Sequence, residues 1–476
     1  MVDKINKSRV LLLVALAQFV VVLDNSIVNV ALPNISRDLH FSAANLQWVV
    51  TAYTLCFGGF LLFGGRAADL FGRRRQFIIG TLAFSLASLM AGLSQSSGML
   101  IVLRGVQGLA AAFMSPAALS IVVNTFKEGP ERNRALGVWG GVAAGGAAAG
   151  LLLGGVLTQY LGWRWDLFVN VPVGLTVAFF AARNIPESKS DLKHQNLDLP
   201  GALLVTAGLM TLVYGLVKAP SYGWTDHRSI ELLGGSAVLL AAFVVNELRA
   251  KQPLMPFSIF RIRNLTAANM VQLPITAGMF SMFFFLSLYI QNILHYSPIR
   301  TGLAFFPVTI IIGISSQLVS RLVSKIGYKP PMVIAPLLIT TGLLIFSRMP
   351  VDGTYLRNVL PGLAVMALGL GFSFVSITIA ATSGVPKHQA GLASGLLNTS
   401  QQIGGALGLA ILSGIFASSI KNASMHGARG PAAQIAGFHD AFFVAAFFTL
   451  SASIIAIIGV KHARGERIDS EAIVNI

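Results

Sequence analysis

Long apolar segments separated by short polar connections run along the whole chain. Each apolar segment, folded as an α-helix, is long enough to cross the roughly 30 Å hydrocarbon core of a bilayer. Fourteen of them occur, near residues 10–32, 46–65, 76–95, 98–123, 134–157, 164–184, 200–218, 229–249, 265–291, 301–323, 330–348, 357–380, 391–420 and 439–461. The pattern predicts an all-α integral membrane protein with fourteen transmembrane helices.

Composition indicates that lipid is the solvent for this chain. Hydrophobic residues make up 54% and charged residues 11% of the 476 residues, whereas a soluble domain carries about 25% charged residues. The first apolar segment, of about 22 residues, is too long for a signal peptide and no small-residue cleavage site follows it. We therefore interpret it as a retained span. The single cysteine, Cys56, excludes an intramolecular disulfide and a cysteine-based metal or redox site.

The distribution of basic residues predicts the orientation. The formal charge of +16 could indicate a nucleic-acid partner, but the basic residues lie between the apolar segments. Counting the two tails with alternate connections, 24 of the 34 Lys and Arg fall on one side of the predicted membrane and nine on the other. The positive-inside rule makes the basic side cytoplasmic. We expect a multi-pass protein of the cell (inner or plasma) membrane, with both termini cytoplasmic, lipid around it and no nucleic-acid partner.

Polar connections divide the chain into six, two and six spans. The segment GRAADLFGRRR at 65–75 has a faint counterpart in SRLVSKIGYKP at 320–330, which aligns Arg66 with Arg321 and Gly72 with Gly327. Duplicated halves around a midplane cavity are typical of transporters. We predict a six-helix bundle over 1–185, two linker helices over 186–263, a second six-helix bundle over 264–462 and a cytoplasmic tail over 463–476. A longer external connection is expected over 421–438.

Two charges inside spans suggest the chemistry. Asp24 is the acid placed well inside a span, where a charge costs about 2.5–3.5 kcal/mol and intramembrane ionisable groups are usually functional. Arg104 is its basic counterpart, and each lies about six residues, or roughly 9 Å, from the outer surface. We therefore expect Asp24 and Arg104 to interact, directly or through water or Gln107. A carboxylate that can bind and release a proton suits exchange of protons against a cationic substrate.

Further polar side chains follow helical spacing on these and other spans. Gln107 and small residues follow Arg104 on one face, and a polar stripe of Gln18, Asn25 and Asn29 runs along the first span. In the span at 391–420, Asn398, Gln401 and Gln402 predict either a cavity lining or hydrogen bonds between helices.

The fifth span is unusually rich in glycine. Gly146, Gly150 and Gly154 are four residues apart, with Gly155 beside them, which is the spacing that brings helix backbones together. Two interpretations remain open, tight packing alone or a helix that bends or slides between two states. In the loop after span two, Asp69 stands beside four arginines, which indicates a salt bridge or a contact with a helix N-terminus that can lock and release the cytoplasmic face.

Other classes of function lack their motifs. The eight histidines show no HxxxH or HExxH spacing, so we expect no metal site. The sequence contains no GxxxxGK[ST] phosphate loop and no paired intramembrane acids. We expect no catalytic residues and no cofactor, so the protein is predicted not to be an enzyme and to use the proton gradient as its energy source. A channel is the rival from another class, but a pseudo-duplicated chain with one buried acid does not resemble a symmetric pore.

Several ordered motifs resemble the fourteen-span drug–proton antiporters of the major facilitator superfamily, the QacA/EmrB-like group. They are LDNSIVNVALP at 23–33, LQWVVTAY at 46–53 with Tyr53, GGRAADLFGRRR at 64–75, LIVLRGVQG at 100–108, GWRWDLFVNVPVG at 162–174 and GLASGLLNTSQQIGGALG at 391–408. The resemblance implies that Gly65, Asp69, Gly72 and Arg73 form a cytoplasmic gate and that Arg104 serves proton coupling.

The same resemblance implies a function and a mechanism. It implies alternating access between two bundles around a Phe- and Met-rich cavity that takes hydrophobic or cationic drugs, dyes or antibiotics, with multidrug efflux and antibiotic resistance as the outcome and a monomer as the working unit. The alternative is a dedicated exporter of one endogenous metabolite or antibiotic. Two departures from the pattern stand out. Leu151 follows Gly150 where the antiporter motif has proline, and Asp166 occupies a position expected to be apolar. Asp166 is either a second acid at an external cavity mouth or an interfacial residue, which we favour.

Overall fold

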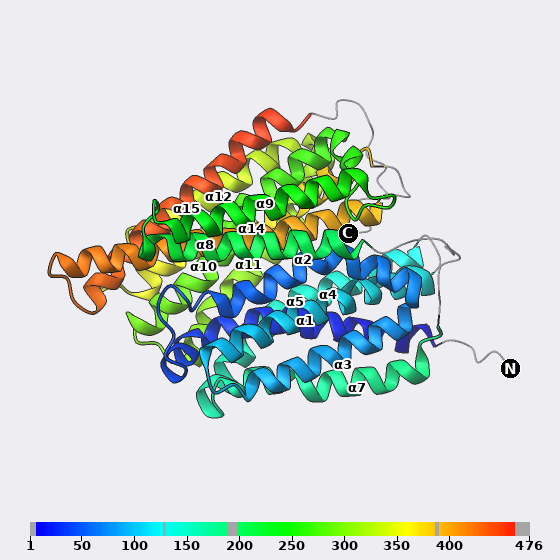
Figure 1. Cartoon of the computed structure of the whole chain (residues 1–476), viewed down its shortest axis with the longest axis horizontal. Helices are drawn as coiled ribbons and strands as arrows, with labels where there is room; N and C mark the ends of the chain where they lie inside the picture. The colour runs from blue at the N-terminus through cyan, green and yellow to red at the C-terminus, as the bar shows by residue number, and fades with distance from the viewer. Residues whose placement is uncertain (1–5, 127–129, 188–197, 386–389, 462–476) are drawn as a thin grey trace.

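The computed structural model describes residues 6–126, 130–187, 198–385 and 390–461. These residues form helices joined by short connections. The helices are α1 (Lys7–Asp38), α2 (Trp48–Phe71), α3 (Arg73–Gly92), α4 (Ser97–Thr125), α5 (Pro130–Tyr160), α6 (Arg164–Phe168), α7 (Asn170–Asn184), α8 (Leu199–Tyr222), α9 (His227–Arg249), η1 (Phe257–Arg261), α10 (Arg263–Asn292), α11 (Pro298–Ile326), α12 (Lys329–Phe346), η2 (Tyr355–Val359), α13 (Leu360–Thr382), α14 (Ala390–Met425) and α15 (Pro431–Gly459). They lie roughly side by side in one elongated bundle (Figure 1).

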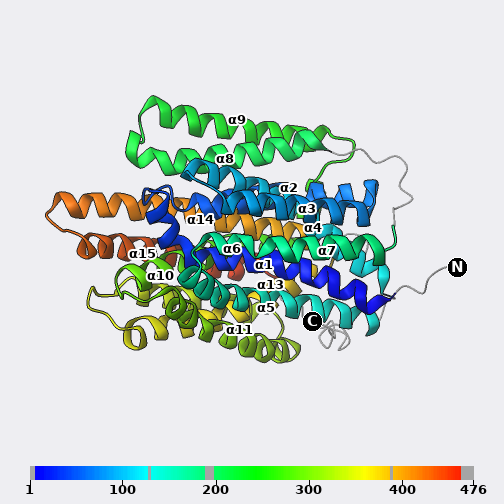
Figure 2. The same cartoon turned by 90° about the horizontal axis from the view of Figure 1, so that it is seen from below.

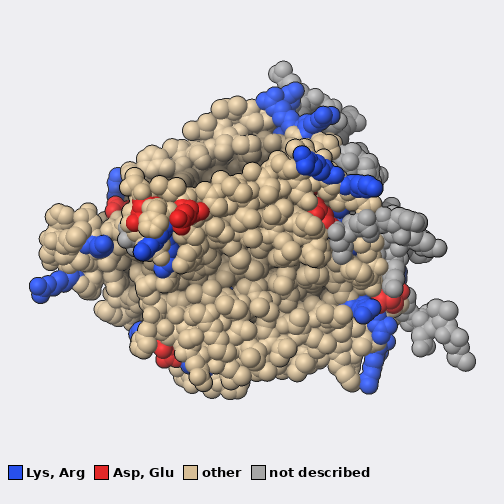
Figure 3. Space-filling view, viewed as in Figure 1, with Lys and Arg blue, Asp and Glu red and all other residues tan. Residues whose placement is uncertain are grey.

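Within the described residues, thirteen helical segments are long and apolar enough to cross a membrane. They coincide with thirteen of the fourteen predicted segments, with α6 and α7 together forming one of them, Arg164–Asn184. The remaining predicted segment, 134–157, lies within the 31-residue helix α5. On the face seen in Figure 3, Lys and Arg gather toward the two ends of the molecule and leave a broad band without charged side chains between them. That band is what a bilayer would cover.

One predicted connection proved to be largely helical. The segment 421–438 was expected to be a polar external connection, but α14 continues to Met425 and α15 begins at Pro431. The two helices project together beyond the rest of the bundle (Figure 1, orange). Polar residues at the end of a long helix do not stop it, because a helix that leaves the bilayer can hydrate its side chains without losing its backbone hydrogen bonds.

The helix contacts repeat between the first and second halves of the chain. In the first half α1 packs on α5, α2 and α3 on α4, and α3 on α7, while in the second α10 packs on α14, α11 and α12 on α13, and α12 on α15. The halves meet mainly through two equivalent pairs, α5 with α11 and α14 with α2, and α1 also packs on α10. This duplication agrees with the weak repeat in the sequence.

Helices α8 and α9 form a hairpin at the edge of the bundle (Figure 2). They pack on each other, and α8 also contacts α2 and α14. The ends of α1 and α15 at Lys7 and Gly459 lie at one end of the molecule, which we call the tail end (Figure 1, right). The opposite end, where α1 finishes at Asp38 and α10 at Asn292, is called the far end.

Candidate functional site

A fully buried network surrounds Asp24 inside the first half of the bundle. Asp24 on α1 and Arg104 on α4 are both inaccessible to solvent, and Arg104 Nη1 lies 2.6 Å from Asp24 Oδ2. Gln107 Nε2 donates to Asp24 Oδ1 at 2.8 Å, and Gln107 Oε1 accepts from Arg104 Nη1 at 2.7 Å. The contact expected from the equal depth of the two charges is therefore present, and Gln107 closes a three-residue ring around it.

Two further side chains complete the network, and sequence reasoning did not single them out. Asn170 Nδ2 on α7 donates to Asp24 Oδ1 at 2.8 Å and to Ser88 Oγ at 3.0 Å. Ser88 on α3 also accepts from Gln107 and donates to the Leu167 carbonyl at 2.8 Å. Asn170 lay inside a recognised motif and could have been identified as a polar residue in a span. Ser88 carried no signal, because a serine in an apolar helix usually bonds only its own backbone.

Arg104 is held from three sides. Its Nε donates to the Val49 carbonyl of α2 at 2.9 Å, and the ring of Tyr53 lies under the guanidinium, 4.5 Å from Cζ to the ring centroid. Such a cation–π contact is worth about 2 kcal/mol or more when both groups are desolvated. Tyr53, expected as a cavity residue, instead packs against the arginine and is completely buried. An arginine bound by a carboxylate, a carbonyl and an aromatic ring is stabilised as a cation in the apolar interior.

Asp166 corrects an expectation. It was interpreted as interfacial, yet only 1% of it is exposed. Thr158 Oγ1 on α5 donates to Asp166 Oδ2 at 2.5 Å, while Asp166 Oδ1 has no hydrogen-bond partner among the described residues. The interfacial reading failed because the short helix α6 turns this position inward against α5, α1 and α3 instead of outward to the headgroups.

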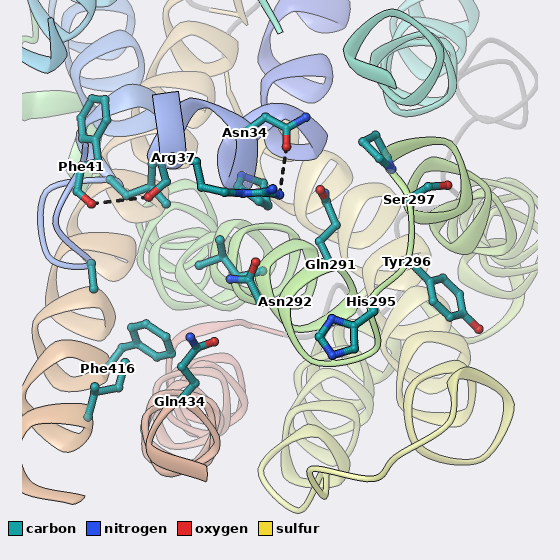
Figure 4. Close-up of a pocket in the computed structure, with 17 residues that line it drawn as sticks. Asn34, Arg37, Phe41, Gln291, Asn292, His295, Tyr296, Ser297, Phe416 and Gln434 are labelled. Carbon is teal, nitrogen blue, oxygen red and sulfur yellow. Dashed lines mark hydrogen bonds between the residues drawn. The ribbon is translucent and has the colours of Figure 1, made fainter. Parts of the chain in front are cut away.

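A cavity with a volume of about 940 Å³ lies at the far end (Figure 4). This far-end cavity is bounded by α1, α10, α14 and α15, the loop after α1, and the connection from α10 into α11. Arg37 and His295 are its basic lining residues, and Arg37 Nη2 donates to Asn34 Oδ1 at 3.1 Å. Other polar groups come from Ser36, Gln291, Asn292, Tyr296, Ser297 and Gln434.

The far-end cavity is not lined by the residues expected from the sequence to line a cavity between the bundles, so that expectation stays a prediction. None of Gln18, Asn25, Asn29, Tyr53, Asn398, Gln401 and Gln402 lines the far-end cavity. Gln18 accepts from Ser115 at 3.0 Å across the α1–α4 contact, and Gln402 is buried where α14 packs on Gly58 of α2. Asn398 is exposed. The expected Phe- and Met-rich lining is also absent there, since Phe41 and Phe416 are its phenylalanines and no methionine lines it.

Proline in α1 creates a contact between the halves next to this cavity. Pro33 has no N–H, so the Asn29 carbonyl four residues earlier loses its helical donor. Ser287 Oγ of α10 donates to that carbonyl at 2.6 Å, and Gln291 Nε2 donates to the Val30 carbonyl at 2.8 Å. Gln291 also lines the far-end cavity. The two α10 side chains therefore join α1 to α10 beside the cavity.

Glycines on α5 place its backbone against α1. A Cβ at Gly150 would collide with Ser26 Oγ and lie 2.8 Å from the Leu23 carbonyl, and one at Gly154 would lie 2.8 Å from the Ile27 carbonyl. Gly146 sits in the same row, while Gly155 faces Pro298 and Ile299 of α11. The α5 backbone therefore packs closely on α1 on one side and on α11 on the other, and the contact with α11 joins the two halves.

At the tail end, the predicted gate loop forms the turn between α2 and α3. Gly72 has φ of +104°, a conformation that favours glycine, and the Glu187 carboxylate accepts from the Arg74 and Arg75 backbone N–H groups at 3.2 Å each. A carboxylate at a helix N-terminus is stabilised by the helix dipole. This acid after α7 was not identified from the sequence.

The contacts of the other predicted gate residues say less about their role. Gly65 makes an ordinary contact with Pro116 of α4, and Arg73 begins α3. Asp69 falls within α2, but its side chain lies outside the described part of the structure. The salt bridge or helix contact expected of Asp69 stays a prediction.

Comparison with known proteins decides the family. A sequence profile of the Major Facilitator Superfamily matches residues 14–409. The chain belongs to this superfamily. Among its curated relatives are the puromycin resistance protein pur8 of Streptomyces alboniger, 40% identical over 94% of this chain and 89% of that one, and the cephamycin export protein CmcT of Amycolatopsis lactamdurans, 39% identical over 94% and 91%.

Further relatives and solved structures agree with that assignment. The multidrug resistance protein Stp of Mycobacterium tuberculosis is 35% identical over 87% of this chain and 76% of its own length. The crystal structure of the POT family transporter PepTSo superposes with a TM-score of 0.70 at 15% identity, covering 95% of this chain and 96% of that one. As a major facilitator protein with thirteen described apolar helices, the chain is a multi-pass membrane protein.

Proposed function

We propose that this protein is a proton-coupled secondary transporter that exports hydrophobic or cationic drugs, dyes or antibiotics by alternating access. The observation that carries the proposal is the buried Asp24–Arg104–Gln107 network in a chain whose relatives include resistance and export proteins. A desolvated carboxylate bound to an arginine can exchange its ion pair for a proton, which is the event that proton coupling requires.

The proposed topology has fourteen spans, namely the thirteen apolar segments together with α5. Both termini are cytoplasmic in it. Support comes from the 31-residue length of α5, its position between α1 and α11, and the charge asymmetry of the sequence. On this topology the tail end faces the cytoplasm and the far-end cavity opens outside. Helices α1–α7 and α10–α15 form the two moving bundles, α8 and α9 are peripheral, and a monomer is the working unit.

Drug export is tested in a host that lacks its own efflux pumps. Expression should lower susceptibility to several chemically unrelated compounds, and Asp24→Asn should abolish that protection at equal membrane abundance. Ethidium efflux from loaded cells should stop when a protonophore is added. Protection against none of the panel, or efflux that persists with the protonophore, would remove the support for this function.

A dedicated exporter of one antibiotic is the second candidate. The names of relatives that refer to one compound, puromycin and cephamycin, favour it. The same panel separates the two candidates, because a dedicated exporter protects against one structural class and leaves ethidium inside the cells. A channel, the third class, would equilibrate the dye and could not pump it against its gradient.

A further inference from the structure

Asp166 is a buried acid that the proposed proton site does not use. It lies in α6 with 1% of its surface exposed, and its Oδ2 accepts a 2.5 Å hydrogen bond from Thr158 of α5. Its Oδ1 is enclosed without a hydrogen-bond partner among the described residues. Asp166 thus accepts one hydrogen bond, whereas an ionised carboxylate can accept about four.

Among the residues that the structure describes, no cation forms an ion pair with this acid. Helices α1, α3, α5 and α7 pack on α6, and within the described residues none of them brings a Lys, Arg or His into ion-pair distance of Asp166. Arg164, two residues earlier, is bound to Asp38 at 2.7 Å and to the Ser94 carbonyl at 3.3 Å. Tyr160 of α5 is exposed. On the α1 side, Asn170, four residues after Asp166, is bound to the acid Asp24 at 2.8 Å.

The position of Asp166 connects it with the network. It precedes Asn170 by four residues, and Asn170 donates to Asp24. On its other side, Trp163 and Arg164 contact Asp38 at the far end. Asp166 therefore stands between the proposed external surface and the Asp24–Arg104 pair. Both acids are buried, but Asp24 has an arginine and two amide donors, whereas Asp166 has one hydroxyl.

We propose that Asp166 is a second protonation site of the transport cycle, which holds a proton from the external side while Asp24 remains ionised against Arg104. Burial without a countercharge favours the neutral carboxyl, because an isolated carboxylate loses its hydration with no compensation. A proton from external water binds to a carboxylate oxygen, and it returns to water when α5 and α6 separate enough to hydrate the site. The inference rests on the proposed proton-coupled export and adds a second proton to it.

Infrared spectroscopy of the purified full chain in lipid vesicles tests the protonation directly and needs no substrate. At neutral pH the wild type should show the carbonyl stretch of a protonated carboxyl, shifted in heavy water, that disappears in Asp166→Asn and persists in Asp24→Asn. Asp166→Glu should retain the band at a changed frequency. A wild-type-minus-Asp166→Asn difference spectrum that lacks this band would overturn the proposal. Melting of each variant confirms that it is folded.

The proton stoichiometry of ethidium transport tests the role in transport. In inside-out vesicles, about two protons should leave the lumen for each ethidium transported by the wild type, and about one for Asp166→Asn. Asp166→Glu should restore the ratio of two. An unchanged ratio in Asp166→Asn would refute the second coupling proton. Wild-type vesicles that transport no ethidium in response to a proton gradient would instead refute the proposed function, while the infrared band would still decide whether Asp166 holds a proton.

Discussion

Replacing Arg104 by glutamine should destabilise the protein far more than an ordinary polar substitution. Asp24 Oδ2 would lose its 2.6 Å partner and remain a buried carboxylate whose remaining donors, Gln107 and Asn170, both bind Oδ1. Removing one partner of a buried ion pair costs about 3–5 kcal/mol, because the other charge is left uncompensated. That is a large fraction of the roughly 5–15 kcal/mol that stabilises a typical fold.

Adding Asp24→Asn to Arg104→Gln should recover most of the lost stability. In Arg104→Gln combined with Asp24→Asn both charges are gone, and two amides remain beside Gln107. We expect each single variant to melt well below the wild type in detergent, and the double variant to melt above either single one. A compensation of about 2 kcal/mol or more would correspond to the uncompensated-charge penalty that the double change removes.

A matched pair at the protein surface provides the control. Arg164 and Asp38 lie 2.7 Å apart, but their side chains are 39% and 52% exposed, so the same substitutions there should cost about 0–1 kcal/mol. Export provides the second readout. The double variant should remain inactive although it is stable, since it lacks the Asp24 carboxylate that exchanges its ion pair for a proton in the proposed mechanism. Additive losses of melting temperature for Arg104→Gln and Asp24→Asn would show that the two residues are not coupled.

Three further predictions concern packing, the gate and the cavity. Gly150→Ala should destabilise the protein by about 1–3 kcal/mol through its collision with α1, whereas Gly141→Ala, which meets nothing within 4 Å, should melt at or above the wild type because alanine favours a helix over glycine. Glu187→Gln should lower the melting temperature by the equivalent of about 0.3–1 kcal/mol, because it removes the negative charge from the α3 N-terminus; an unchanged melting temperature would contradict this. Arg37→Glu should raise the apparent affinity for cationic ethidium about thirtyfold, because about 1 kcal/mol of repulsion between two charges ~4 Å apart in water is replaced by about 1 kcal/mol of attraction, and identical KM values would show that the far-end cavity is not on the export path.

The features predicted well from the sequence depend on length and depth. An apolar segment must span a fixed thickness, so thirteen of the predicted spans reappear as apolar helices with small changes at their ends. Asp24 and Arg104 were placed at one level by counting residues along two antiparallel helices, and the structure joins them. Counting residues does not show which helices are neighbours. Charged side chains are rare inside the membrane, however, and usually pair with one another.

The features that were missed depend on packing in three dimensions. Asp166 was judged by its distance from a span end, and that distance does not tell which way a five-residue helix faces. Tyr53 and Gln402 were expected in a cavity because they are polar residues in spans, yet one lies under a guanidinium and the other between α14 and α2. Glu187 acts on a helix more than one hundred residues away in sequence, and no local pattern contains that contact.

If Asp24 is the proton site, as we propose, helix α1 offers a route by which protonation and the contact between halves can affect each other. Asp24 holds α1 to α4 and α7, while the carbonyls of Asn29 and Val30, five and six residues later, hold it to α10. The first of these carbonyls is free to bind Ser287 because Pro33 cannot donate to it. Neutralising Asp24 weakens the attachment of α1 to its own bundle and leaves the attachment to α10 unchanged. Protonation therefore shifts the balance of forces on one helix between the two bundles, and alternating access requires a bias of that kind.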